Sequence, residues 1–178
     1  MTDPNGTPHD PAAAGGWQLA QVNVARPVAP LTDPALAGFV AALEPVNALA
    51  DAAPGFVWRL QTEDGDATAV RVLDDDALIV NLTVWASLET FTDFVFRSGH
   101  VEVMRRRRQW FVPMREAITA LWWVPAGHRP TVAEAEERLL ALRADGPAPR
   151  AFTLRSPFPP PGGDPASVAP DESAVCPA

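Results

Sequence analysis

The chain has 178 residues, the length of one domain with a core of useful size. Its hydrophobic fraction of 47% and its charged fraction of 20% are ordinary for a globular protein. The formal net charge of −8 argues against binding to nucleic acid or to an anionic membrane surface, because both need a basic surface.

The cysteine and histidine content limits the possible cross-links and metal sites. The single cysteine, Cys176, lies near the C-terminus, so no disulfide can form within the chain. With only three histidines as well, a closed zinc site is not expected. The N-terminal residues lack the apolar stretch of a signal peptide, and no apolar run reaches the length of a membrane span. We therefore expect a cytoplasmic protein.

Both ends of the chain differ in composition from its middle. Residues 1–16 and 157–178 are rich in Pro, Gly and Ala and show no hydrophobic periodicity. Such segments bury too little apolar surface to fold, so we expect disordered tails there. Residues 17–156 are expected to form one domain.

The first half of that domain alternates strands and a helix. A strand is predicted at 17–25, and a helix follows, which Asp33 can cap. Pro45 is expected to kink this helix or restart it. A strand rich in aromatic and β-branched residues is predicted at 55–62, and 67–72 is a candidate for a short edge strand.

The second half continues the alternation. The predicted elements are, in order, a strand at 77–85, a long helix from Ser87 to about Phe111, a strand at 117–125, a helix over 131–146 and a short strand at 151–156. Thr131 and Glu134 match a capping box at the start of the last helix. The order β-α-β-β-α-β is that of a ferredoxin-like α+β sheet with helices on one face, here followed by an extra helix.

The long helix carries the main candidate for chemistry, His100. At about 100° per residue, a continuous helix through this region points His100 at the sheet, and Arg107 lies on the same side two turns later. The side chains within about 60° of His100 on this projection are those of Phe96, Val103, Met104 and Phe111. The histidine ring is therefore expected in the middle of an apolar arc.

Two interpretations of His100 remain open. The ring can be a core histidine that bonds a backbone carbonyl or Asp93. It can also face a cavity, as a general acid/base or as an axial ligand of a metal or heme. Burying Arg107 nearby requires a partner, which a protein carboxylate or an anionic ligand group could supply.

Polar and aromatic residues on the strands are the other candidates. Asn23 shares a strand face with Gln21 and belongs either to a half-exposed face or to a pocket. Asn81 lies on the same strand face as Trp85, which indicates a wet pocket wall or a subunit interface. Trp122 and Trp123 are adjacent on their strand and point to opposite faces of it. One of the two is expected to line the pocket or pack under helices, and the other is expected to lie in a dimer interface.

The stretch from Trp17 to about Phe152 resembles the dimeric α/β-barrel superfamily, which includes antibiotic-biosynthesis monooxygenases and heme-degrading monooxygenases. The likeness lies in "NLTVWASLETFTDFVFRSGH", with a strand that ends in Trp, a helix start bearing Ser and Glu, aromatic residues along the helix, and a Ser shortly before a His. With "PGFVWRLQ" and "WWVPAGHRPTVAEAEERL" the whole chain looks most similar to an uncharacterised branch of that superfamily.

The resemblance implies a homodimer whose subunits pack sheet against sheet, with a pocket inside each subunit between sheet and helices. In the heme-degrading members, an Asn and a His face the heme from positions that match Asn23 and His100. Phe94 stands near the place where those enzymes have a Trp, which weakens the heme-degrading prediction. Cofactor-free members hold a phenolic substrate with Trp, Asn and Arg side chains, which Trp85, Asn23 and Arg107 could supply.

The leading prediction is a cofactor-free, monooxygenase-like enzyme of secondary metabolism that acts on an aromatic or polycyclic substrate in an apolar pocket. His100 would be the acid/base, and Arg107 and Asn23 would stabilise an oxyanion. The residues expected to contact the substrate are Trp85, Phe96, Met104, Phe111, Asn81 and Trp123. One alternative is a heme-dependent protein with His100 as axial ligand. The other is a barrel that binds a hydrophobic ligand without catalysis.

Overall fold

A computed structural model describes residues 16–62, 65–97 and 100–168, with the side chains of residues 100–104 left out. Its strands are β1 (Trp17–Ala25), β2 (Phe56–Arg59), β3 (Ile79–Trp85) and β4 (Thr119–Pro125). Its α-helices are α1 (Ala37–Asp51), α2 (Leu88–Arg97), α3 (His100–Trp110) and α4 (Val132–Asp145). Two short 3-10 helices, η2 (Pro34–Leu36) and η3 (Pro165–Ser167), complete the described elements.

The four strands form one antiparallel sheet in the order β2-β3-β1-β4. The two central strands, β1 and β3, are adjacent in space although α1 and β2 separate them in the chain. This crossover is that of the ferredoxin-like plan, so the predicted α+β class is confirmed. In this register Asn23 of β1 lies opposite both Asn81 of β3 and Thr119 of β4.

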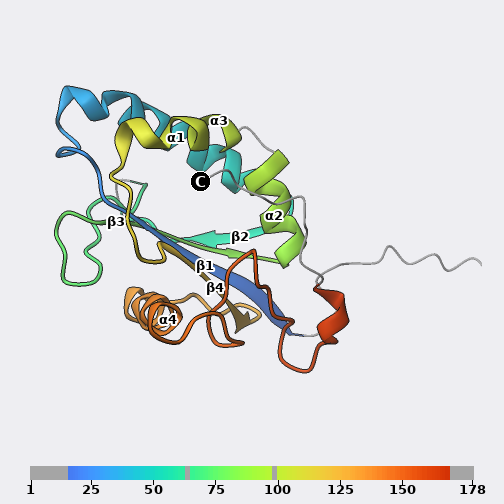
Figure 1. Cartoon of the computed structure of the whole chain (residues 1–178). Helices are drawn as coiled ribbons and strands as arrows, with labels where there is room; N and C mark the ends of the chain where they lie inside the picture. Colours follow the sequence, from blue (N-terminus) through green and yellow to red (C-terminus); the bar gives the residue numbers. More distant parts are fainter. Residues whose placement is uncertain (1–15, 63–64, 98–99, 169–178) are drawn as a thin grey trace, which may run out of the picture.

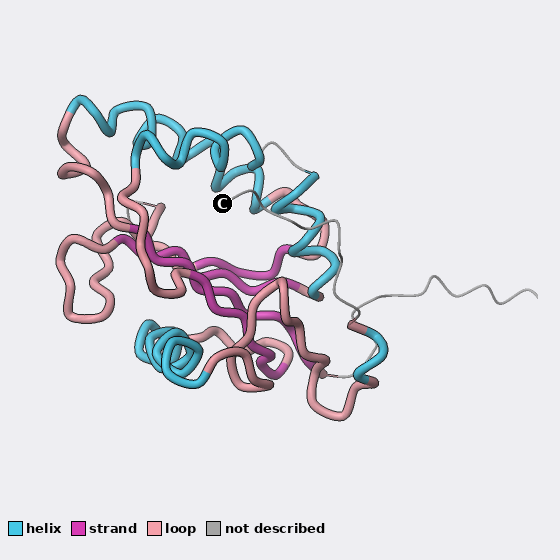
Figure 2. The backbone as a smooth tube through the Cα atoms, in the orientation of Figure 1, coloured by secondary structure: helices cyan, strands magenta, loops and turns pink. Residues whose placement is uncertain are grey.

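Helices cover both faces of the sheet (Figures 1 and 2). The helices α1, α2 and α3 lie on one side, and the extra C-terminal helix α4 lies on the other. The face toward α4 is apolar and closed, because Val22, Leu82 and Trp122 there are at most 1% exposed. Leu139 of α4 and Val72 of the loop before β3 pack into the same core.

The opposite face has an apolar cluster at each end. Near the start of β3, Phe39 and Trp110 pack between α1 and α3, with ring centroids 5.8 Å apart. At the other end of β3, Trp85 packs against Phe91 and Phe94 of α2. These clusters attach the three helices to the ends of the sheet and leave the middle of the face to polar side chains.

The long helix predicted from Ser87 to about Phe111 corresponds to two described helices. Helix α2 ends at Arg97 and helix α3 begins at His100. Residues 98 and 99 between them lie outside the described residues, as do the side chains of residues 100–104. The predicted direction of the His100 ring therefore stays a prediction.

Other boundaries also differ from expectation. Helix α1 runs through Pro45 without a restart, since Phe39 before it and Ala50 after it are both buried. The predicted edge strand at 67–72 is a loop, yet Ala67 and Val72 are buried in the core toward α4. The predicted strand at 151–156 is reduced to isolated bridges, and the one that joins it to the sheet has Phe152 exchange two backbone hydrogen bonds with Leu121.

The predicted capping side chains form their hydrogen bonds, although Asp33 caps the 3-10 helix η2 and not α1, which follows it. The side chains of Asp33 and Thr131 accept hydrogen bonds from Ala35 N and Glu134 N, at 2.8 and 3.2 Å. The Ser87 hydroxyl accepts from Thr90 N at the start of α2, at 3.2 Å.

The chain after residue 156 lies against β4 as far as the described residues extend. The carbonyl of Phe158 accepts a hydrogen bond from the Trp123 indole nitrogen at 2.7 Å. The Phe158 ring also lies 6.0 Å from that of Phe152. Residues 157–168, assigned to a tail from composition, thus contribute contacts to the domain.

The turn before β3 is strained. Leu73 and Asp74 have φ angles of 57° and 51°, a conformation that costs a residue with a side chain roughly 1–2 kcal/mol. Glu136 of α4 accepts a hydrogen bond from Leu73 N at 2.6 Å, and Arg26 of β1's C-terminal extension pairs with Asp75. These contacts hold the turn in place. The hydrogen bond that Arg26 donates to Asp75, together with the charge of Arg26, lowers the pKa of the Asp75 carboxyl below its ordinary value.

We predict that Asp74→Gly stabilises the protein by about 0.5–1 kcal/mol, because glycine adopts positive φ without a steric penalty. The measurement is the free energy of unfolding in urea. The matched control is Asp76→Gly, an exposed position outside the positive-φ pair, where glycine should be neutral or destabilising. Equal effects of the two substitutions would contradict the assignment of strain to this turn.

Glu134 joins α4 to the sheet. Its carboxylate accepts from the Trp122 indole nitrogen at 2.9 Å and contacts His128 Nε2 at 2.7 Å. Partial burial raises the pKa of Glu134, but the hydrogen bonds from His128 and Trp122 outweigh it and leave the pKa below its ordinary 4.5. A carboxyl group of lowered pKa stabilises the fold above its unfolded pKa and loses this effect as the pH falls through the folded pKa.

We predict that Glu134→Ala destabilises the protein by about 1–3 kcal/mol, because the buried indole N–H of Trp122 loses its acceptor. Glu134→Gln keeps an amide oxygen as acceptor and should cost less. Urea unfolding between pH 7 and pH 3 tests both points. The gap between wild type and Glu134→Gln should narrow below pH 4.5, and a constant gap would show that the charge of Glu134 does not contribute.

Candidate functional site

Five polar side chains occupy the middle of the sheet face toward α1, α2 and α3. They are Gln21 and Asn23 of β1, Asn81 and Thr83 of β3, and Thr119 of β4. The strand register places them in two adjacent rows across the sheet, and we call them the polar band. It lies between the Trp85 cluster at one end and the Phe39–Trp110 cluster at the other.

Helices lie over the polar band, yet they do not seal it. Asn81 is exposed and Asn23 and Thr119 are half buried, whereas side chains at the same level on the opposite face are buried. One cause is that β2 ends at Arg59, opposite Thr83, so no strand lies beside β3 at Asn81. The band can therefore be reached from the edge of the sheet.

The hydrogen bonds of the band fix two of its amides. The Asn23 amide nitrogen donates to Thr119 Oγ1 at 2.8 Å and to the carbonyl of Ile118 at 3.4 Å. The Gln21 side-chain oxygen accepts from Thr83 Oγ1 at 2.9 Å. Both amides belong to β1, in the centre of the sheet, where the backbone is held by strands on both sides.

Arg107 is the cation that α3 turns inward. Its neighbours Arg105, Arg106 and Arg108 are exposed, whereas Arg107 is half buried and Trp110, one turn later, is buried. Its guanidinium group forms no hydrogen bond or ion pair within the described part of the chain. A half-buried cation without a carboxylate partner is suited to bind an anionic group.

Arg59 lies at the end of the polar band and is already paired. Its Nε donates to Asp51 at the end of α1, at 2.9 Å, and its Nη1 donates to the carbonyl of Gly65 at 2.6 Å. These bonds tie β2 to α1 and leave Arg59 with a structural role.

The residues predicted from the sequence do not all meet at the polar band. Asn23 and Asn81 are part of it, and Arg107 and Phe111 come from the helix layer at one end. Phe111 packs edge-on against Phe39, with ring centroids 5.0 Å apart. The side chains of His100 and Met104 lie outside the described residues, so only the position of His100 at the start of α3 is available.

Trp85 is less accessible than the sequence analysis expected. It is 1% exposed, and its ring lies 4.9 Å from Phe94 and 5.4 Å from Phe56. Its indole nitrogen donates to Thr83 Oγ1 at 2.9 Å. Trp85 therefore positions the Thr83 hydroxyl of the polar band, and its one polar side-chain atom is not available to a ligand.

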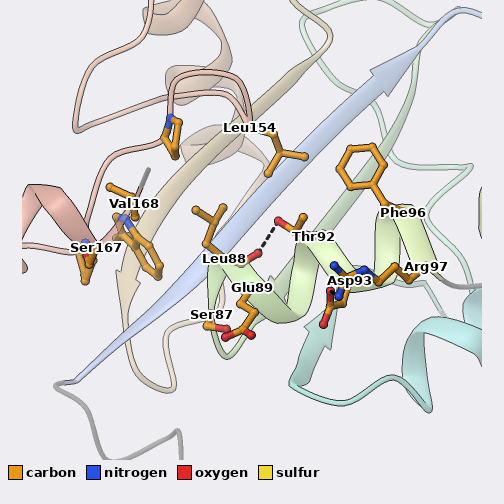
Figure 3. Close-up of a pocket in the computed structure, with 13 residues that line it drawn as sticks. Ser87, Leu88, Glu89, Thr92, Asp93, Phe96, Arg97, Leu154, Ser167 and Val168 are labelled. Atoms are coloured by element: carbon orange, nitrogen blue, oxygen red, sulfur yellow. Dashed lines mark hydrogen bonds and ion pairs between the residues drawn. The ribbon is translucent and has the colours of Figure 1, made fainter. Parts of the chain in front are cut away.

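Phe96 and Trp123 line a second candidate site, a groove between α2 and the C-terminal segment that follows α4 (Figure 3). It has a volume of about 470 Å³, and Leu154 and Val168 form part of the wall opposite α2. On the α2 side, Asp93 and Arg97 form an ion pair at 2.9 Å. Two of the predicted substrate contacts, Phe96 of α2 and Trp123 of β4, thus line this groove and do not belong to the polar band.

The remaining surface gives further limits. Within residues 16–62, 65–97 and 100–168, no cluster of three or more His, Cys, Asp or Glu side chains is arranged to hold a metal ion. Among the helices of those residues, none combines the length and apolar character needed to cross a membrane.

Gln21 is the functional candidate that sequence reasoning did not select. The alternation of β1 places it on the same face as Asn23, which was the available signal. Gln21 is a candidate because it accepts a hydrogen bond from Thr83, on a strand about sixty residues later. No local sequence pattern could have predicted that contact.

Comparison with solved structures finds distant likenesses. SnoaB, a cofactor-independent oxygenase from Streptomyces nogalater, is 19% identical and matches with a TM-score of 0.42 over 66% of this chain and 98% of its own. NE2512, a protein of unknown function from Nitrosomonas europaea, is 14% identical with a TM-score of 0.39, over 65% of this chain and 94% of its own. No curated protein matches the chain. Likenesses of this size carry no conclusion about the site.

A family model gives a firmer assignment. The model described as "Domain of unknown function (DUF3291)" matches residues 18–168, which include the whole polar band and every described helix and strand apart from the first residue of β1. An uncharacterised branch was expected from the sequence, and this expectation is confirmed. The chain belongs to the DUF3291 family of domains of unknown function.

Proposed function

We propose that this chain is a small-molecule enzyme of the monooxygenase-like type, which binds an aromatic or polycyclic substrate over the polar band. The observation that carries the proposal is the incompletely covered row of amides and hydroxyls on an otherwise apolar sheet face. Aromatic clusters at both ends of the row offer flat apolar contact, and the amides between them offer orientation. Ligand sites in enzymes commonly combine these two features.

In this proposal His100 takes the proton of a substrate hydroxyl or enol, and Arg107 stabilises the oxyanion that results. The position of His100 at the start of α3 puts it on the same helix as Arg107, on the side of the sheet that carries the band. The hydrogen bonds of Asn23 favour a role as acceptor and argue against its predicted role in oxyanion stabilisation. Its amide nitrogen already bonds to β4, so it offers its oxygen, a hydrogen-bond acceptor.

The heme alternative rests on His100 as the axial ligand, and the His100 ring lies outside the described residues, so this alternative stays a prediction. The histidine ring that the structure describes, His128, bonds to Glu134 beside α4, on the far side of the sheet from the polar band, and is not placed to serve as that ligand. The reaction proposed here is the cofactor-free one.

The resemblance to dimeric barrels implied two subunits packed sheet against sheet. In this chain α4 and the loop around Val72 already cover the face that such a dimer would use. A homodimer of this protein would have to form through another surface, unless α4 moves away. The proposal for the polar band needs only one chain.

We predict that His100→Ala lowers the turnover of dithranol, a hydroxylated anthrone, by about 10²- to 10⁴-fold, the usual contribution of a general acid/base. Binding of dithranol should persist. Turnover is followed by oxygen consumption and by the absorbance of the product, with the uncatalysed rate subtracted.

His128→Ala is the matched control and should leave turnover unchanged, because His128 lies beside α4. Full turnover by the His100→Ala variant would refute the acid/base role, and binding without turnover in the wild type would favour a carrier. The visible spectrum of the purified wild type should lack a Soret band. A Soret band that disappears in His100→Ala would support the heme alternative instead.

We predict that Arg107→Met lowers kcat by about 10²-fold, the usual effect of losing a group that stabilises an oxyanion, without lowering the melting temperature. The melting temperature should be unchanged because Arg107 forms no ion pair within the described residues. Arg106→Met, on the exposed side of α3, is the control for kcat. A large fall in the melting temperature of Arg107→Met would show that Arg107 serves the fold.

A further inference from the structure

Three buried side chains form a directed chain of hydrogen bonds from β3 to β1. The Trp85 indole nitrogen donates to Thr83 Oγ1, and Thr83 Oγ1 donates to Gln21 Oε1, each at 2.9 Å. The three residues are 1%, 5% and 4% exposed. An indole N–H can only donate, so the Thr83 oxygen accepts from it and keeps its own hydrogen for Gln21.

This chain determines which half of the Gln21 amide is left over. The oxygen of the amide is occupied by Thr83, so the nitrogen, with two hydrogens, is what Gln21 can offer. This nitrogen has no hydrogen-bond partner in the described part of the chain. It is not among the fully buried unpartnered side-chain atoms of the described residues, which are Arg138 Nε and Arg143 Nη2, so it keeps some contact with solvent. Gln21 is thus a 96% buried side chain whose amide nitrogen has donors without a protein partner among the described residues.

Asn23, two residues further along β1, is fixed in the opposite sense. Its nitrogen donates to Thr119 Oγ1 and to the carbonyl of Ile118, and only the nitrogen of an amide can donate to a carbonyl. The oxygen of Asn23 is left as an acceptor. Both residues point to the same face of the sheet, because side chains two apart on a strand do.

We propose that Gln21 and Asn23 are the specificity-determining pair of the polar band, with Gln21 donating to a carbonyl oxygen of the substrate and Asn23 accepting from a hydroxyl. Two positions along a strand are separated by about 6.6–6.8 Å, which is close to the length of one substituted aromatic ring. The substrate class is then a neutral aryl ketone or quinone-like molecule with a hydroxyl at the far end of the ring. This inference rests on the proposed function, since it uses the same site.

The groups that bind the pair are expected to be neutral, because the pair itself carries no charge and Arg59 beside it is already bonded to Asp51 and to Gly65. Arg107 acts in the proposed function on the charge that develops during the reaction. The order of the two groups is also set. A ligand bound in reverse would place its carbonyl against the Asn23 oxygen, a repulsive contact between two acceptors, although its hydroxyl oxygen could still accept from the Gln21 N–H. The pair thus selects an orientation as well as a class.

The test uses three matched probes and isothermal titration calorimetry. 4-Hydroxybenzophenone has both groups at opposite ends of one ring, 4-methoxybenzophenone lacks the hydroxyl hydrogen, and 4-hydroxydiphenylmethane lacks the carbonyl. The wild type should bind the first about 3- to 10-fold more tightly than either of the others, the size expected for one net hydrogen bond.

Variants separate the two contacts. Gln21→Met should remove the preference for the carbonyl and keep the preference for the hydroxyl, and Asn23→Leu should do the reverse. Thr83→Val, which leaves the Gln21 amide free to turn, should weaken the carbonyl preference although Thr83 touches no probe. Gln109→Leu, on the exposed side of α3, is the control and should keep both preferences.

The possible failures are distinguishable. Equal affinity of the wild type for the three probes, or unchanged preferences in both Gln21→Met and Thr83→Val, would overturn the pair while leaving the polar band as a binding site. No binding of any probe by the wild type would overturn the proposed site together with the pair. Melting temperatures establish that each variant is folded. If Gln21→Met does not fold, the carbonyl preference of Thr83→Val decides the test.

Discussion

The central physical constraint on this molecule is that its four-stranded sheet must bury two faces with unequal chemistry. The face toward α4 is closed by aliphatic side chains and Trp122, with essentially no exposure. This closed core supplies most of the apolar burial that the sheet needs. The opposite face can then keep amides and hydroxyls in its centre, because its helices are attached through aromatic clusters at the two ends. The polar band exists because the other side of the same strands is so well packed.

Much of the architecture could be predicted from local signals. The alternation in β1 and β3, and the caps at Asp33 and Thr131, come from residues next to each other in the chain, and the structure has them where expected. The errors arose where tertiary contacts decide. Pro45 stays within a helix that is packed on both sides of it. The segment around Val72 has apolar residues like a strand, but it buries them from a loop.

The candidate site could be predicted only in part. Alternation predicted that Asn23 shares a face with Gln21 and that Asn81 shares a face with Trp85. That the two strands bring Asn23 and Asn81 together follows from the strand register, which no local pattern contains. The orientation of each amide depends on Thr119 and Thr83, which are distant in sequence, so the sequence alone could not show which atoms are free. The projection that points His100 at the sheet assumed one helix, and it stays a prediction because the His100 side chain lies outside the described residues. Trp85 was predicted to contact substrate, and the structure shows it 1% exposed with its indole nitrogen bonded to Thr83.

The early end of β2 has a consequence for traffic into the site. Because the strand stops opposite Thr83, the Asn81 side chain stays exposed at the edge of the sheet. A ligand held in the proposed site would therefore meet solvent at its Asn81 end. Added substituents should be tolerated best at that end and least at the end that reaches β4.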